Sequence, residues 1–202
     1  MSPLRQQMID AMVLRGLARR TQQAYLSVVA QLADNMMQRI NHAAALNSIN
    51  LIALCLLATD KHTLTRTELE QQINFYLALQ RAAPYHEQLT LPEEPATQLI
   101  DHALSLQKVQ QHSDSFGQLI SLTDDNAILL SYYRNNILHL FILPAILASA
   151  VLHQRELSQQ QLSTIVQQLY PLLQQELFLD IAELDDYCAA LFQYMLGAGL
   201  IE

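Results

Sequence analysis

Hydrophobic residues recur every three or four positions along most of the chain, which predicts a mainly α-helical protein. Gly16 is expected to end the first helix, because helices commonly stop at a glycine in the left-handed conformation. The spacing predicts helices over residues 3–14, 21–42, 49–58 and 96–106, and then over 125–153, 158–176 and 182–196.

One more helix is predicted to start after Thr65. Glu68 follows Thr65 by three residues, and this spacing is typical of a capping box, in which each side chain bonds to the other residue's backbone N–H. The expected buried stripe of this helix is Leu69, Ile73, Tyr76 and Leu77.

Prolines are expected to interrupt the helical pattern in two ways. Pro84, Pro92 and Pro95 indicate a surface loop. Pro144 and Pro171 lie inside apolar patterns, where each removes a backbone donor, so each is predicted to kink or split its helix.

A small β-hairpin is predicted over residues 108–122, where the sequence alternates weakly around the turn-forming stretch SDSFG. Three helices followed by a hairpin resemble a winged helix, and the acidic character of this unit favours a protein contact over DNA. We therefore predict a helix pair over 1–33, a winged-helix-like unit over 34–122 and a helical bundle over 123–202.

Composition excludes several classes of protein. Of the 202 residues, 51% are hydrophobic and 15% charged, which excludes a disordered chain. Cys55 and Cys188 are too far apart for a disulfide scaffold or a thiolate zinc finger, and Cys55 lies in an apolar run typical of a core. Charge is uneven: residues 1–20 carry a net +3 and residues 21–202 a net −11, which makes the larger part a poor nucleic-acid binder.

The most apolar stretch, residues 137–152, is shorter than the ~20 residues that span a bilayer. We interpret it as a buried helix, with peripheral contact with the inner membrane as the alternative. The expected location is the cytoplasm.

The segment SYYRNNILHLF holds the most unusual polar pattern. On one continuous helix, Tyr132, Asn135, Asn136 and His139 would form a polar stripe, with Arg134 on nearly the opposite side and Tyr133 beside it. These side chains either satisfy neighbouring backbone groups, with Arg134 paired to a carboxylate, or contact a ligand or another domain. We favour the first alternative.

No metal or cofactor site is predicted. The seven histidines include no pair at metal-ligand spacing, so each is interpreted as a lone surface side chain. The chain also contains no Walker loop and no Gly-x-Ser-x-Gly motif.

Five blocks, in order, resemble the bacterial membrane-associated glycerol-3-phosphate 1-O-acyltransferase. They are MMQRINHAAALNSINLIALCLLAT, LTRTELEQQINFYL, ATQLIDHALSL, ILLSYYRNNILHLFILPAILASAV and QQLYPLLQQELF, and the resemblance covers residues 30–202. It implies a region C-terminal to the catalytic core of an enzyme that esterifies glycerol 3-phosphate from acyl-CoA or acyl-carrier protein. The implied partner is the catalytic domain of the parent enzyme.

The resemblance does not supply catalytic residues. The family's general base is a histidine followed five positions later by aspartate, and none of the seven histidines has an aspartate there. No Pro-Glu-Gly block occurs either. The chain is therefore expected to be inactive alone.

Residues 3–33 instead resemble the start of the N-terminal domain of phage integrases and transposases. In that alternative, Arg15, Arg19 and Arg20 would contact DNA phosphates. No His-x-x-Arg of the recombinase chemistry is present. The two resemblances lead to the hypothesis of a truncated or chimeric gene product joined near residues 28–36, and a DNA-binding fragment is the alternative function.

Overall fold

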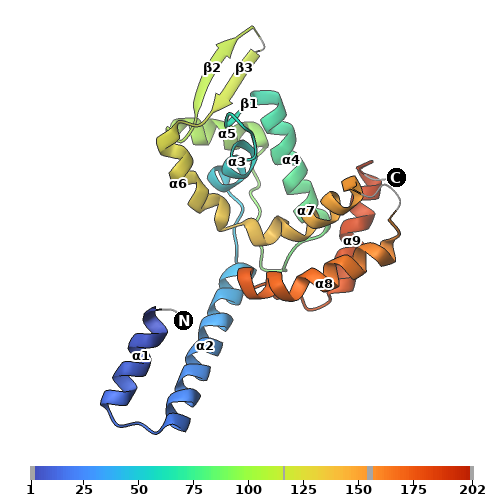
Figure 1. Cartoon of the computed structure of the whole chain (residues 1–202). Coiled ribbons are helices and arrows are strands. Elements are labelled where there is room, and N and C mark those ends of the chain that lie inside the picture. The colour runs from blue at the N-terminus through green and yellow to red at the C-terminus, as the bar shows by residue number, and fades with distance from the viewer. Residues whose placement is uncertain (1–2, 116, 154–156, 201–202) are drawn as a thin grey trace. The chain divides into compact units, whose positions relative to one another are not determined.

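The computed structural model describes residues 3–115, 117–153 and 157–200. It divides into two compact units, residues 1–40 and residues 41–202. The predicted mainly helical fold with a small β-sheet is confirmed (Figure 1).

Two helices make up the first unit, α1 (Pro3–Leu14) and most of α2 (Arg19–His42). Gly16 ends α1 as predicted, with a φ of 70° and an N–H that donates to the Val13 carbonyl at 2.9 Å. Among the described residues of this unit, Met12 is the one buried hydrophobic side chain.

The second unit begins with helices around a three-stranded antiparallel sheet. The elements follow in the order α3 (Ser48–Leu56), β1 (Thr63–Thr65), α4 (Arg66–Ala82), α5 (Ala96–Ser105), β2 (Gln110–Asp114) and β3 (Gly117–Ser121). Strands β2 and β3 form the predicted hairpin, whose residue 116 lies outside the described residues. Strand β1, which the sequence did not predict, pairs with β3 and places Leu64 opposite the buried Ile120.

Helix starts in this unit follow local capping chemistry. The Thr65–Glu68 capping box is present, and Leu69, Ile73 and Leu77 of α4 are buried as predicted, while Tyr76 is half-buried. A second capping box, between Asn47 and Asn50, starts α3.

The predicted single helix over residues 125–153 is wrong. It is two helices, α6 (Asp124–Asn135) and α7 (Leu138–His153), bent by 84°. The break falls at Asn136 and Ile137, where the N–H of Ile137 donates to a carbonyl three residues back, as in a tight turn. The bend leaves Ile137 1% exposed. Pro144 lies inside the unbroken α7, so of the predicted kink or split, the split does not occur.

The last two helices are α8 (Gln159–Leu177) and α9 (Leu184–Gly197). Pro171 lies within α8, which also continues through it. One hydrophobic core joins α3, α4, α5 and β3 to α7, α8 and α9. The apolar residues 137–152 contribute Ile137, Leu140 and Leu147 to it, so the first part of this stretch is buried as predicted, whereas Leu152 at its end is 81% exposed.

Among the described residues, a single helix long and apolar enough to cross a membrane does not occur. The bent pair α6–α7 reaches that length and composition only when both helices are taken together.

Candidate functional site

A group of polar side chains, which we call the polar junction, collects segments that are far apart in sequence. It lies where the end of α2, the loop after α4, the first turn of α7 and the segment after α8 meet. Its members are Asn41, His42, Tyr85, His86, His139 and Asp180.

Asn41 binds the end of α8. Its side-chain Nδ2 donates to the carbonyls of Leu177 at 2.7 Å and Phe178 at 3.2 Å. Phe178 is the C-cap of α8 and has a left-handed φ of 54°. The last carbonyls of a helix have no partner within it, so Asn41 supplies donors that the helix itself lacks.

His42 and His86 form a stacked pair, with ring centroids 4.0 Å apart and planes within 2° of parallel. The Nε2 of His42 lies 3.4 Å from the Asp180 carboxylate and 3.3 Å from the Asp180 carbonyl. The Nδ1 of His86 accepts the Gln88 N–H at 3.1 Å. The expectation that these are lone surface histidines is therefore wrong.

His139 is buried, and its Nε2–H donates to the Asn41 carbonyl at 3.1 Å. Its ring meets the Tyr85 ring edge to face at 5.1 Å. Burial, together with the charge of His42, lowers the pKa of His139 to about 4, although the bond to the Asn41 carbonyl acts to raise it. His139 is therefore neutral at pH 7.

Tyr85 closes the junction from the other side. Its hydroxyl accepts the Asp180 N–H at 3.1 Å, and burial raises its pKa to about 12. In the same segment, the Tyr170 hydroxyl accepts the Ile181 N–H at 2.9 Å. Two tyrosines thus fix the backbone that follows α8.

The chain is expected to lose stability as the pH falls from about 6.5 towards 4. Over that range His139 binds a proton in the unfolded chain but not in the folded one, so acid favours unfolding by up to about 3 kcal/mol. Urea unfolding of wild type and His139→Gln at pH 7 and pH 4.5 measures this. Glutamine keeps an N–H donor but does not titrate, so the free energy of unfolding of His139→Gln should fall less between pH 7 and pH 4.5 than that of wild type. An equal loss in both proteins would contradict the assignment.

The structure does not keep the predicted polar stripe together. Tyr132 is 70% exposed, and Tyr133, Asn135 and Asn136 are also exposed at the end of α6. The bend after Asn136 carries His139 into the polar junction, so the expectation that it satisfies a neighbouring backbone group is confirmed for His139. Arg134 donates to the Asn135 side-chain oxygen at 3.2 Å, where we expected a carboxylate.

Gln80 is a buried polar residue that the sequence interpretation missed. It is 0% exposed; its Nε2 donates to the Leu140 carbonyl at 2.8 Å, and its Oε1 accepts the Tyr85 N–H at 3.1 Å. The Leu140 carbonyl is the one that Pro144, lacking an N–H, leaves without a helical partner. Gln80 therefore satisfies the group that the proline orphans. The sequence does contain a signal for its burial, because Gln80 follows Leu77 by three residues and so occupies the next position of the buried stripe.

The arginines considered for DNA contact lie in the first unit. Arg15, Arg19 and Arg20 are exposed and flank the turn between α1 and α2.

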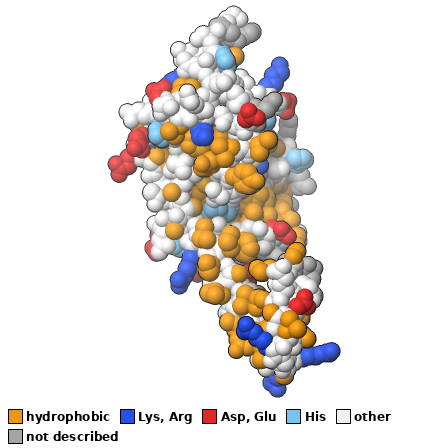
Figure 2. Space-filling view, turned by 90° about the vertical axis from the view of Figure 1, so that its left-hand side faces the viewer, with side chains coloured by type: hydrophobic (Ala, Val, Ile, Leu, Met, Phe, Trp, Pro, Cys, Tyr) orange, Lys and Arg blue, Asp and Glu red, His pale blue; other side chains and the backbone are white. Residues whose placement is uncertain are grey.

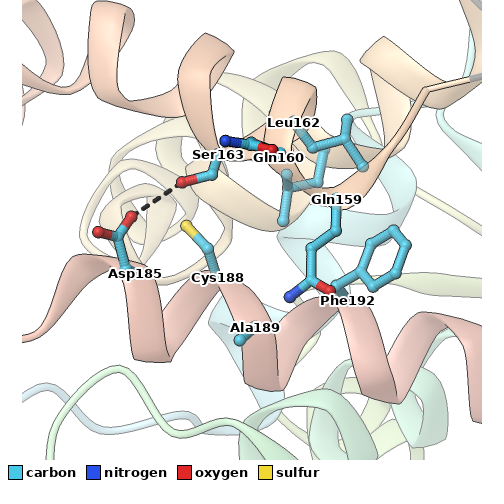
Figure 3. A pocket seen from close by; sticks show the side chains of 9 residues that line it. Gln159, Gln160, Leu162, Ser163, Asp185, Cys188, Ala189 and Phe192 are labelled. Atoms are coloured by element: carbon cyan, nitrogen blue, oxygen red, sulfur yellow. Dashed lines mark hydrogen bonds between the residues drawn. The ribbon is translucent and has the colours of Figure 1, made fainter.

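A cavity of about 340 Å³ lies between α8 and α9 (Figure 3). Ser163 and Gln167 both donate to Asp185 Oδ1, at 2.8 and 2.9 Å. Burial, with the nearby charge of Asp185, raises the pKa of the Cys188 thiol to about 11, so Cys188 is protonated at neutral pH and weakly nucleophilic. Cys188 is therefore not an activated nucleophile in this cavity.

Cys55 is fully buried, as predicted for a core residue, and burial raises its pKa to about 12. Within the described ranges, no group of three or more histidine, cysteine or acidic side chains is arranged to hold a metal ion.

Comparison with known proteins places this fold in a family. The model of the glycerol-3-phosphate acyltransferase C-terminal region matches residues 4–202. The chain belongs to that family. The matched range includes residues 4–33, so the family match extends into the segment predicted to be integrase-like, and that second family stays a prediction.

Relatives from Pseudoalteromonas and Shewanella show how much of an acyltransferase the chain matches. Glycerol-3-phosphate acyltransferase of Pseudoalteromonas atlantica is 43% identical over 175 residues, which are 86% of this chain and 22% of the relative. The enzyme of Shewanella amazonensis is 39% identical over 174 residues, with the same shares. The chain therefore spans about a fifth of the length of the curated acyltransferases it matches.

Proposed function

We propose that this region is a non-catalytic part of a glycerol-3-phosphate acyltransferase and packs on the part of the enzyme that transfers the acyl group. Its place is expected to be the cytoplasm or the inner surface of the inner membrane. A catalytic region would have to offer a general base to the glycerol hydroxyl, because acyl transfer removes the proton of that hydroxyl.

The polar junction is the observation that carries this proposal. The Nε2 atoms of His42 and His139 and the Nδ1 of His86 each contact groups of the chain itself. With the other members of the polar junction they hold four segments together, which is the work of a structural network. A region built in this way supports a neighbouring catalytic part, and we expect no acyl transfer from it alone.

An exchange experiment tests the proposal. In the full-length P. atlantica acyltransferase, the matched region is replaced by this chain. We expect acylation of glycerol 3-phosphate from acyl-CoA to stay within about tenfold of the parent, because the contact surfaces are those of one family. The control is the same relative with the region deleted. Activity no higher than in the deletion, or acylation by the isolated chain, would contradict the proposal.

The DNA-binding alternative has one observation in its favour, the exposed arginines beside the α1–α2 turn. It requires binding to duplex DNA that weakens steeply with salt and is lost when Arg15, Arg19 and Arg20 are replaced by glutamine. The family match from residue 4 supports the acyltransferase function instead, because it continues across the junction near residues 28–36 that the chimera hypothesis requires.

A further inference from the structure

Helix α2 carries an exposed apolar row, which we call the α2 row. Its members are Tyr25, Val28, Val29, Leu32, Met36 and Ile40, each between 43% and 62% exposed. They recur every three or four positions and so share one side of the helix over ~22 Å. In Figure 2, hydrophobic side chains gather over the helix pair at the bottom of the view, with basic side chains at its lower end.

The α2 row adjoins the side of α2 that faces α1, and Val29 belongs to both. A cavity of about 470 Å³ between these helices is lined on α2 by Leu26, Val29, Ala30 and Ala33. Leu4 and Met8 of α1 line the same cavity. Helix α2 is therefore apolar on two sides, and α1 occupies one of them.

The helix pair has little core of its own. Met12 is the one buried hydrophobic side chain among its described residues, although the α2 row alone offers six large ones. A contiguous exposed apolar surface of this kind marks an interaction site.

Charge favours a protein over a lipid surface as the occupant of the α2 row. A helix that lies on anionic lipid is rich in lysine and arginine on its polar side. Here Arg15, Arg19 and Arg20 cluster at the turn end of the helix pair, and Arg39 is the one other lysine or arginine among the described residues of α2.

We propose that the α2 row is the surface through which this region docks on the remainder of the acyltransferase chain. The family match covers the whole row, and the relatives carry about four-fifths of their length outside the matched region. The inference rests on the proposed function and names the contact surface that it requires. The occupant is an apolar surface of the catalytic part, which receives α2 in the manner of a helix in a groove.

A cysteine-labelling experiment tests the docking directly. Leu32→Cys is introduced into this chain and into the exchanged full-length enzyme, solubilised in detergent, and maleimide labelling at that peptide is followed by mass spectrometry. Cys55 and Cys188 are buried thiols with raised pKa values, so they react slowly in the folded chain. We expect labelling at residue 32 to be at least about tenfold slower in the full-length enzyme than in the isolated chain. The matched control is Ile128→Cys on α6, which is 71% exposed and should be labelled equally in both.

The other outcomes identify other occupants. Equal labelling of residue 32 in both proteins overturns the inference, and the proposed function stands if the exchanged enzyme is active. Protection of residue 32 that requires vesicles of phosphatidylethanolamine and phosphatidylglycerol assigns the α2 row to lipid and overturns the inference. Protection of the isolated chain that grows with its concentration assigns the row to a second copy and also overturns it. An inactive exchanged enzyme with residue 32 protected contradicts the proposed function alone.

Discussion

Replacing Gln80 by leucine is expected to lower the free energy of unfolding by about 2–4 kcal/mol, one of the two largest effects anticipated for a single substitution in this chain. Leucine has a similar size but leaves two buried backbone groups without partners, the Leu140 carbonyl and the Tyr85 N–H. Urea unfolding followed by circular dichroism measures the change. Gln71→Leu, at an exposed position of the same helix, is the matched control and should change stability by less than about 0.5 kcal/mol.

Pro144 offers a second test of the same bond. In a Gln80→Leu, Pro144→Ala double variant, the alanine N–H can donate to the Leu140 carbonyl as in an ordinary helix turn. Part of the stability lost in Gln80→Leu should then return, and the two substitutions should be non-additive. Strict additivity, or a Gln80→Leu variant as stable as wild type, would show that the orphaned carbonyl is satisfied in another way.

Leu191→Ala is expected to cost about 2–5 kcal/mol, because the side chain is fully buried and its loss leaves a cavity. Leu191 lies on α9 but belongs to the same core as Ile73 on α4. We therefore expect Leu191→Ala and Ile73→Ala to shift one common unfolding transition. The control is Leu172→Ala on α8, where the side chain is 64% exposed and the effect should be small.

The number of transitions also tests the predicted division between residues 34–122 and 123–202. One cooperative transition, monitored by both circular dichroism and tyrosine fluorescence, is expected from the shared core. Two transitions, with Ile73→Ala shifting one and Leu191→Ala the other, would show that the two parts unfold independently.

The candidate site was visible in the sequence only in fragments. The sequence places His139 on one polar stripe with Tyr132, Asn135 and Asn136; the structure separates it from them and turns it inward beside Asn41 and Tyr85. His42 and His86 were separated by enough chain to look unrelated, and they stack because the loop after α4 returns to the end of α2. Such a pairing depends on long-range packing, which no periodicity in the sequence encodes.

What the sequence by itself determined was local. The Thr65–Glu68 capping box, the stop at Gly16 and the hairpin of β2 and β3 depend on atoms a few residues apart, so the residue types in one short stretch were enough to predict them. The helix break shows what only the tertiary structure decided. The sequence predicts a kink or a split at Pro144, yet Gln80, from another helix, satisfies the carbonyl that the proline orphans, and the chain bends at Asn136 and Ile137, where Ile137 becomes buried. Gln80 and Leu140 are 60 residues apart in the sequence, so only the packing of one helix against another brings this partner to the carbonyl.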